Sequence, residues 1–207
     1  MILIACGLQR EASILTAPGI LPIPGGGESA RLEAALEAQV PGASMILSCG
    51  IAGALAPALK AGDVVLDLAH GPAEMAQHLQ AALPHAHLGT IIGQDHIAAT
   101  VAEKAVLHAT TGALAVDMES HIAARVAARH GLAFAAIRTI SDTAHETLPP
   151  AARVGMNPDG SMALGRVLLS VACNPAQIPA LIRTGRGAEA AFRALCQATN
   201  ALKLLTR

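Results

Sequence analysis

Short apolar runs alternate along the chain with segments in which apolar residues recur every three to four positions. The short runs predict buried strands, and the recurrence at helical spacing predicts helices. Strands are expected at Ile2–Cys6, Met45–Cys49, Val64–Leu68, Leu88–Ile92, Leu114–Val116 and Ala133–Ile140. Helices are expected at Ala30–Gln39, Ala73–Leu83, Ile97–His108 and Ser120–His130. The chain from Ser161 to Leu205 is expected to be mostly helical, divided at Pro175 and at Gly185–Gly187.

Alternating strands and helices favour an α/β fold with a largely parallel sheet. The glycine and proline stretches at Gly25–Gly27 and Leu148–Pro150 are too short to link separate domains. We therefore expect residues 1–207 to form a single domain.

Composition excludes several classes of protein. The net charge is −1, there is no basic run, and aromatic residues make up 1% of the chain, so nucleic-acid binding has little support. No run of 18 apolar residues predicts a membrane span, and Met1–Gly7 lacks the basic leader of a secretory signal. The four cysteines contain no C-x-x-C pair, which predicts reduced, mostly buried thiols in a cytoplasmic protein. The histidines are scattered, and we expect no metal site.

Candidate chemistry gathers after the predicted strands. In α/β sheets, ligands bind beyond the carboxyl ends of the strands. Four segments there carry Gly, Ser or carboxylate residues that a core does not require: Gly7–Glu11, Ser48–Gly53, Asp117–Glu119 and Ser141–Asp142. We expect them to converge on one site.

Two of these segments carry acids with distinct potential roles. Asp117 and Glu119 flank Met118 where a strand gives way to a helix, and a carboxylate there can accept hydrogen bonds from sugar hydroxyls. The simpler alternative is capping of the helix by Asp117. Asp142 can donate a proton to a ring nitrogen of a departing base, which requires a raised pKa. The alternative there is an Asp that serves only in a turn.

The other two segments have similar alternatives. Backbone N–H groups in Ser48–Gly53 can face a phosphate or a sugar oxygen, or the segment is only a tight turn. It lacks the G-x-G-x-x-G pattern, so a dinucleotide site completed by Asp67 is a weaker rival. Glu11 can activate water, or it is an ordinary acid of a first helical turn.

Taken together, the motifs resemble the nucleoside phosphorylase and nucleosidase superfamily. The likeness is carried by Ser48–Gly53 with Gly62-Asp63-Val64, by Val116–Ser120 and by Arg138–Asp142. A narrower likeness, carried by Thr111-Gly112-Ala113, Val116–His121 and Leu148–Ala152, is to the hopanoid-biosynthesis-associated phosphorylases, which remove adenine from adenosylhopane.

The resemblance implies a three-layer α/β/α sandwich around a mixed, largely parallel central sheet, assembled as a homo-oligomer. It implies that Asp142, assisted by Ser141, protonates N7 of a purine, and that Glu11 positions or activates the nucleophile. Glu119 would bind the ribose hydroxyls with Met118 against the sugar. The remaining implied contacts are Ser48, Gly50, Gly53 and Arg10 at the sugar or phosphate end and Ile97 or His96 at the base.

The chemistry implied requires no metal or organic cofactor, but it leaves phosphate open as a co-substrate. Many phosphorylases have an arginine where this chain has Met45, which favours water, whereas the narrow branch is phosphorolytic. With only Phe134 and Phe192 in the chain, base stacking is expected to be mostly aliphatic, and affinity is expected to come from a large apolar tail.

The expected partner is therefore a purine nucleoside, lipid-linked in the leading hypothesis. That hypothesis predicts an apolar mouth at Leu148–Pro150 or around Ile178–Ile182, with peripheral contact to a membrane. Methylthioadenosine or adenosylhomocysteine is the alternative substrate, and a non-catalytic purine nucleoside-binding relative is the second alternative.

Overall fold

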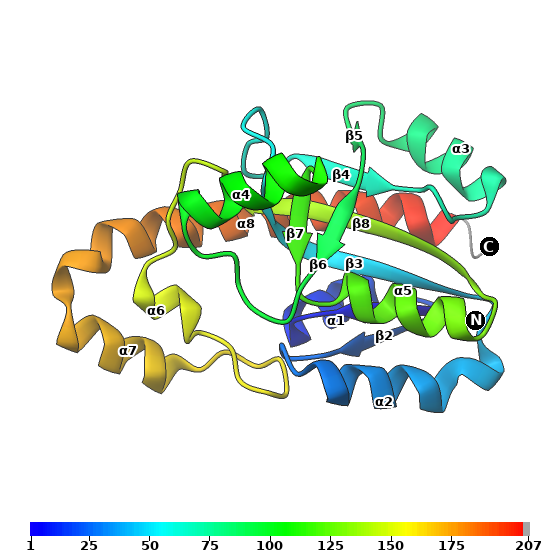
Figure 1. Ribbon diagram of the computed structural model, residues 1–207. Helices are drawn as coiled ribbons and strands as arrows, with labels where there is room; N and C mark the ends of the chain where they lie inside the picture. Colours follow the sequence, from blue (N-terminus) through cyan, green and yellow to red (C-terminus); the bar gives the residue numbers. More distant parts are fainter. Residues whose placement is uncertain (205–207) are drawn as a thin grey trace.

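A mixed eight-stranded sheet forms the centre of the protein (Figure 1). The computed structural model describes residues 1–204. The strands are β1 (Ile2–Cys6), β2 (Ile20–Pro24), β3 (Met45–Ala54), β4 (Val64–Asp67), β5 (His87–Leu88), β6 (Ile91–Gly93), β7 (Ala115–Asp117) and β8 (Ala133–Asp142). Their order is β2-β1-β3-β8-β4-β5, with β7 paired to both β3 and β6.

The sheet is mostly parallel, as the alternation of strands and helices predicted. Only the β3–β7 and β4–β8 pairings are antiparallel. The long strands β3 and β8 run parallel through the middle. The carboxyl ends of β3 and β8 therefore lie side by side at one edge of the sheet. Ligands of α/β folds bind beyond the carboxyl ends of the strands.

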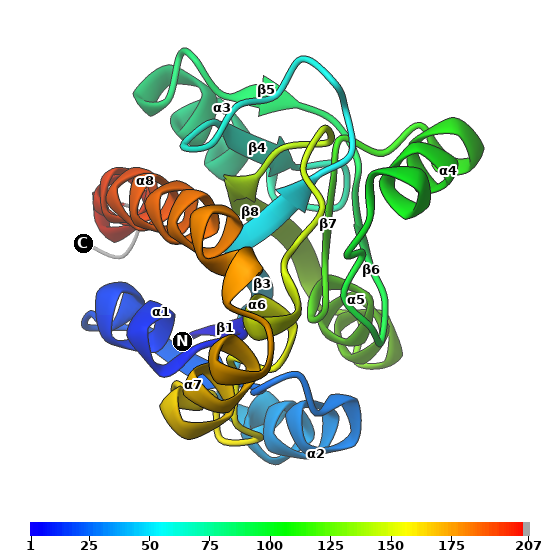
Figure 2. The same ribbon diagram turned by 90° about the vertical axis from the view of Figure 1, so that its left-hand side faces the viewer.

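Helices cover both faces of the sheet (Figures 1 and 2). They are α1 (Gln9–Leu15), α2 (Ser29–Gln39), α3 (Ala73–Ala82), α4 (Val101–Thr111), α5 (Ser120–Arg129), α6 (Pro150–Arg153), α7 (Leu164–Cys173) and α8 (Ile178–Lys203), with 3-10 turns η1 (Val40–Gly42) and η2 (Pro175–Gln177). Apolar clusters place α2 and α5 on one face and α1, α3 and α8 on the other. This confirms the three-layer architecture.

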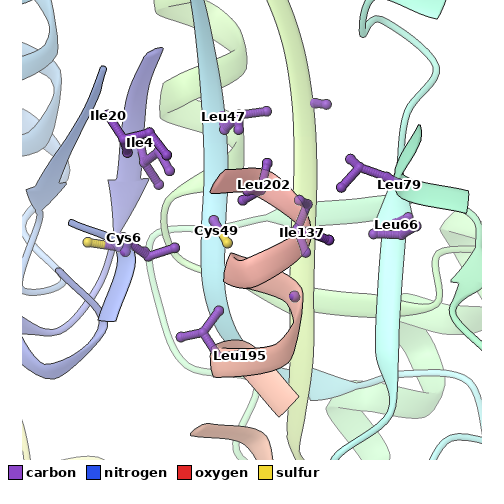
Figure 3. Packing of buried hydrophobic residues seen from close by; sticks show 14 of the residues in the cluster. Ile4, Cys6, Ile20, Leu47, Cys49, Leu66, Leu79, Ile137, Leu195 and Leu202 are labelled. Atoms are coloured by element: carbon purple, nitrogen blue, oxygen red, sulfur yellow. The ribbon is translucent and has the colours of Figure 1, made fainter. Parts of the chain in front are cut away.

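The alternation of side chains along β1 shows how the two cores are separated. Leu3 and Ala5 pack towards α2 and α5, whereas Ile4 and Cys6 pack towards α1 and α8. Because successive residues of a strand point to opposite faces, five apolar residues in a row serve both layers. Figure 3 shows the core on the face covered by α1, α3 and α8, where side chains of β3 and β8 pack against α8. Each fully buried leucine there contributes roughly 1.5–3 kcal/mol.

The six predicted strand regions are all present, but three elements were not predicted. These are β2, α1 and α6. The sequence of β2 includes Pro22 and Pro24, which argues against a central strand, and β2 indeed lies at the edge of the sheet. The expected strand Leu88–Ile92 is divided into β5 and β6.

Two helix boundaries differ from the prediction for clear physical reasons. Helix α4 begins at Val101 rather than Ile97, because Thr100 and Glu103 form a capping box. Helix α8 continues through Gly185–Gly187, so the predicted division there is wrong. A Cβ on Gly187 would lie 2.1 Å from the Ser141 carbonyl oxygen, so this glycine serves close packing rather than a break. Pro175 does separate α7 from α8, and Leu205 lies outside the described residues.

The cysteines are only partly as predicted. Cys6 and Cys49 are buried, and burial raises the pKa of Cys49 to about 12, which keeps the thiol protonated. Cys173 and Cys196 are exposed, so the expectation of mostly buried thiols fails for half of them. Within residues 1–204, no helix is long and apolar enough to cross a membrane.

Candidate active site

A pocket of about 590 Å³ lies where β1, β3, β7 and β8 end. Each of the four segments singled out in the sequence contributes to its lining. The predicted site residues on its wall are Arg10, Glu11, Gly53, His96, Ile97, Met118, Glu119, Ser141 and Asp142. Ser48 and Gly50 are not on this wall. Glu119 and Asp142 thus share one cavity, although they come from different elements.

Glu11 is held in the first turn of α1 entirely by backbone donors. The N–H groups of Gly7 and Leu8 donate to one carboxylate oxygen, and that of Ile51 donates to the other, all at 2.7 Å. Burial raises the pKa of Glu11, against the opposing effects of Arg138 and these three donors. A fixed acid with a raised pKa and a lone pair left over has the properties of a general base.

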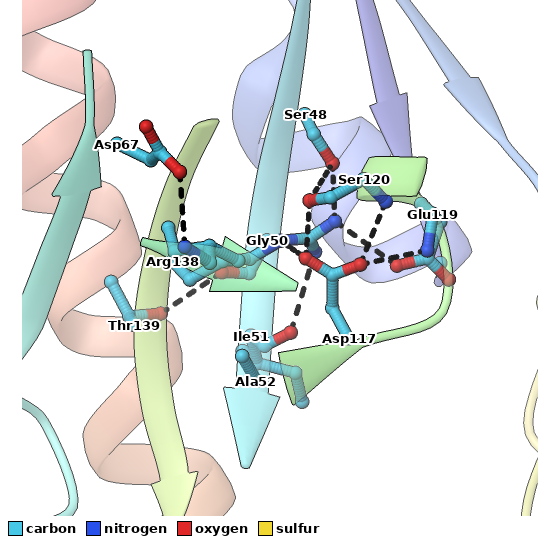
Figure 4. A network of polar contacts seen from close by, with 12 residues as sticks. Ser48, Gly50, Ile51, Ala52, Asp67, Asp117, Glu119, Ser120, Arg138 and Thr139 are labelled. Atoms are coloured by element: carbon cyan, nitrogen blue, oxygen red, sulfur yellow. Dashed lines mark hydrogen bonds and ion pairs between the residues drawn. The ribbon is translucent and has the colours of Figure 1, made fainter. Parts of the chain in front are cut away.

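Arg138 is the fully buried cation at the centre of the site and had no predicted role (Figure 4). It extends from β8 across β3, and its Nε lies 2.8 Å from Asp117 Oδ2. Its Nη2 lies 3.1 Å from Glu119 Oε2 and also donates to the Ser48 hydroxyl. Burial opposes its charge, but the surrounding carboxylates outweigh this and raise the pKa of Arg138. Arg138 therefore orients Glu119.

Asp117 lies two residues before Glu119, which is the N-cap of α5, so the predicted cap is only partly realised. Its Oδ1 accepts from the backbone N–H groups of Glu119 at 2.9 Å and Ser120 at 2.7 Å. Its other oxygen is occupied by Arg138 and by the Ser120 hydroxyl. All its lone pairs are thus committed to protein groups, which leaves Glu119 as the acid of this segment with an oxygen available to a ligand.

Glu119 carries the clearest electrostatic signature in the site. Burial, reinforced by Asp117 and Glu11, raises the pKa of Glu119 to about 7 in spite of Arg138. One cation is therefore shared among three buried carboxylates. A carboxyl group that titrates near neutrality in a pocket is typical of functional sites.

Ser48 is not on the pocket wall. It is fully buried, 2.9 Å from the Ser120 hydroxyl and in contact with Arg138. Gly50 is not on the wall either, so the ligand contacts implied for these two residues stay predictions. A Cβ on Gly50 would lie 2.4 Å from Glu11 Oε1, so this glycine makes room for the carboxylate and Arg138. Gly53 does line the pocket, beside Asp142.

A β-bulge sets the position of Ser141 and Asp142. Ala52 pairs with Ile140, but Gly53 pairs with Asp142, so Ser141 is the extra residue on β8. The Ser141 hydroxyl lies 2.8 Å from Asp142 Oδ1 and 3.1 Å from the Ala52 carbonyl. The bulge therefore places hydroxyl and carboxyl side by side at the rim of the sheet.

Lys104 is the site residue that sequence reasoning missed entirely. It is fully buried, it is the only buried residue of α4, and its Nζ forms an ion pair with Asp142 Oδ2. Nζ also donates to the carbonyls of Thr143 at 2.8 Å and Glu146 at 3.0 Å. The only sequence signal was a lone lysine in a helix with no other cation, which is common on surfaces. The ion pair and the two carbonyl contacts hold the Lys104 ammonium group beside Asp142.

Arg10 reaches the pocket but is already paired. It forms a bidentate ion pair with Glu189 of α8, and its guanidinium lies 4.0 Å from the centre of the Phe192 ring. Phe192 also lines the pocket, which the sequence did not predict. A phosphate contact from Arg10 would require it to leave Glu189.

His96 and Ile97 lie on the pocket wall, and their contact with a base stays a prediction. Asp95 does not cap α4, whose N-cap is Thr100. Its carboxylate instead contacts the Ser29 hydroxyl and lies 3.0 Å from His121 Nε2. Asp67 accepts from the Ile91 backbone N–H at 3.0 Å, so the acid of the rival dinucleotide hypothesis has a structural role.

Comparison with known proteins agrees with this geometry. Residues 67–172, just over half of the chain, match the sequence profile of the phosphorylase superfamily. The chain therefore belongs to the phosphorylase superfamily. It is an enzyme of the nucleoside phosphorylase and nucleosidase class, as the sequence motifs indicated. No curated protein matches the chain significantly.

Solved structures show the same fold at low sequence identity. The S-adenosylhomocysteine nucleosidase of Streptococcus pyogenes, in complex with 5-methylthiotubericidin, superposes with a TM-score of 0.70 at 18% identity, covering 99% of this chain and 96% of its own. A Helicobacter pylori 5′-methylthioadenosine/S-adenosyl homocysteine nucleosidase gives 0.68 at 15% identity with the same coverage. The futalosine hydrolase of that organism gives 0.57 at 17%, covering 68% of this chain and 87% of its own.

Proposed function

We propose that this protein cleaves the N-glycosidic bond of a purine nucleoside with a large apolar 5′ substituent, releasing adenine to leave a ribosyl product. Adenosylhopane is the leading candidate substrate. One observation carries this: Glu11, Glu119 and Asp142 line one pocket whose outer wall is apolar. Three acids in one cavity suit a reaction whose transition state carries positive charge on the ribose.

At the ribose end, Glu119 accepts hydrogen bonds from the two ribose hydroxyls while Arg138 holds its other oxygen. Met118 packs against the sugar. Because Glu119 and Glu11 are both near the sugar, their negative charge stabilises the oxocarbenium character that develops there. Preorganised charge of this kind is a large contributor to enzymatic rate.

At the base end, Asp142 takes the position of the group that hydrogen-bonds N7 of the purine. In the proposed mechanism, Asp142 and its ion-pair partner Lys104 together supply the proton. As the glycosidic bond breaks, its electrons pass to the base, and a proton passes from the pair to N7. Ser141 keeps the carboxyl group oriented.

The charge of the pocket favours water as the acceptor. Its wall carries four carboxylates, and the buried cations Arg138 and Lys104 neutralise only two of these charges. Arg10, the one arginine on the wall, is paired with Glu189. A phosphate dianion would be repelled by this surplus of negative charge, but water would not. Glu11 is placed to take the proton from the attacking water, whose oxygen then forms the new bond to the ribose carbon.

The outer wall supports an apolar 5′ substituent. It includes Leu148, Ala152, Met156, Met162 and Phe192. Burying a hydrocarbon tail here gains roughly 25 cal/mol per Å² before ordering costs. The apolar stretch Leu148–Pro150 predicted from the sequence supplies part of this wall through Leu148.

A second candidate is a methylthioadenosine or adenosylhomocysteine nucleosidase. It is favoured by the likeness in fold to nucleosidases of that kind, which extends over 99% of the chain. The catalytic groups would be the same. Only the use of the apolar wall differs, so the two candidates are separated by the length of the 5′ substituent.

The test is adenine release from methylthioadenosine, adenosylhomocysteine, a long-chain 5′-alkylthioadenosine and adenosylhopane, each with and without phosphate. We expect kcat/KM to rise with the apolar 5′ group and to be independent of phosphate. Strict phosphate dependence would contradict hydrolysis, and equal turnover of methylthioadenosine and adenosylhopane would contradict the apolar-tail preference.

The variant Asp142→Asn tests whether the protein catalyses base release or only binds the nucleoside. We expect base release to fall about 10²–10⁴-fold, because the proton route to N7 is lost, while nucleoside binding is largely retained. Glu74→Gln on the exposed face of α3 is the matched control and is expected to leave turnover unchanged. No release by the wild-type protein from any of the four nucleosides would instead favour a non-catalytic nucleoside-binding relative.

A further inference from the structure

Helix α7 is strongly apolar, yet none of its residues is buried. Leu168 and Leu169 are 67% and 66% exposed, and Leu164 is also exposed. Figures 1 and 2 show α7 standing away from the sheet with α6 and the start of α8. α7 contacts α6 and η2, but these contacts leave its leucines uncovered by any of the described residues. Exposed apolar residues of this kind are typical of an interaction surface.

Exposed apolar residues also occur in the segments on either side of α7. We call the set the α7 surface: Val154, Met162, Leu164, Leu168, Leu169, Ile178 and Ile182. Met162 is 68% exposed and also lines the pocket, so the α7 surface meets the pocket at this residue.

The charge around this surface is strongly asymmetric. Residues 150–187 contain Arg153, Arg166, Arg183 and Arg186 but only one acid, Asp159, although the whole chain has a net charge of −1. All four arginines are exposed. Exposed leucines among arginines are the composition of helices that lie in the interface of an anionic membrane.

We propose that the α7 surface docks on an anionic phospholipid bilayer, with the leucines at the level of the acyl chains and the arginines among the headgroups. A second copy of the chain fits less well, because a two-fold contact through this surface would bring two sets of arginines together. The docking does not depend on the reaction proposed above, but it would place the pocket rim at the membrane.

The test is co-flotation of the full chain with vesicles of phosphatidylcholine alone or of phosphatidylcholine mixed with phosphatidylglycerol. We expect about tenfold greater partitioning onto the mixed vesicles, with loss of this preference at about 1 M salt. The double variant Leu168→Asp/Leu169→Asp should lose binding to both, because the leucines supply the apolar contact. Neither leucine lines the pocket, so turnover of a water-soluble nucleoside serves as a check of folding.

The matched control is Val106→Asp, which changes an equally exposed apolar residue on α4 and should leave vesicle binding unaltered. A second variant, Arg183→Ala/Arg186→Ala, should reduce the preference for phosphatidylglycerol while keeping residual binding. Absence of wild-type binding to mixed vesicles, or equal losses in Val106→Asp, would overturn the proposal. So would a dimer that the double leucine variant dissociates while vesicles bind nothing.

Discussion

Two buried cations lie behind the pocket wall, and their charges are neutralised differently. Arg138 faces Asp117 and Glu119, with Glu11 close by. Lys104 faces one carboxylate, Asp142, and two backbone carbonyls. The first cluster has surplus negative charge, whereas the second is balanced. This difference fits the proposed function, in which the Arg138 cluster is the ribose end and the Lys104 cluster is the base end.

The largest effect is expected from Arg138→Met, which breaks the first cluster. It leaves three buried carboxylates without their cation, so the free energy of unfolding should fall by about 3–5 kcal/mol at neutral pH. The loss should shrink in acid, because the carboxylates can then be buried in protonated form. Denaturant unfolding at several pH values measures both.

Arg125→Met is the matched control for that variant. Arg125 pairs with Glu33 at 2.7 Å but is 49% exposed, so its loss should cost no more than about 1 kcal/mol. Equal losses for the two arginines would mean that burial of the charges at the ribose end carries no special cost.

Lys104→Met breaks the balanced cluster and should act mainly on turnover. We expect kcat to fall about 10²-fold with a smaller change in KM, because Asp142 keeps its place but the pair loses its proton source.

Lys104→Arg should restore part of the rate, and Lys60→Met, at an exposed position, should have no effect. A folded Met variant with an unchanged kcat would reduce Lys104 to a purely structural residue. Steady-state assays of adenine release provide kcat and KM.

The smallest effect is expected from titration of Glu119, whose pKa is raised to about 7. Below pH 7, KM for the nucleoside should rise by up to about tenfold per pH unit, because the protonated acid accepts hydrogen bonds poorly. The free energy of unfolding should instead be larger in acid. A raised pKa favours the native state in acid, so this contribution is lost as pH rises from about 4.5 through 7.

Glu119→Gln should flatten both pH dependences, at the cost of a higher KM throughout. If KM keeps the same slope in this variant, the titrating group is another residue. Isothermal titration with a non-reactive nucleoside analogue would separate binding from turnover.

The sequence predicted the sheet well because its strands are short apolar runs between turns, and β1 appears with the expected bounds. It did not predict β2, because the two prolines of this strand are typical of a loop. It also did not predict that α8 is continuous, because the glycines within α8 are typical of a helix end. The segments of the site were predictable because carboxylates and glycines after strands have little structural reason to be there.

What the sequence could not reveal were partnerships between distant residues. Lys104 lies 38 positions before Asp142, and nothing local marks it as buried. Likewise, Ser48 lies in a segment that is typical of a binding site, but its hydroxyl forms hydrogen bonds with Arg138 and Ser120. Burial and pairing of polar groups arise from tertiary packing, so they require coordinates.

The bulged residue of β8, Ser141, affects the candidate site without being needed for the fold. Ser141 has no paired residue on β3. Its deletion would therefore let β3 and β8 pair in unbroken register, and both hydrophobic layers would stay intact. The hydroxyl that orients Asp142 would vanish with it. A lineage could thus lose this activity in one genetic step and retain a well-folded protein.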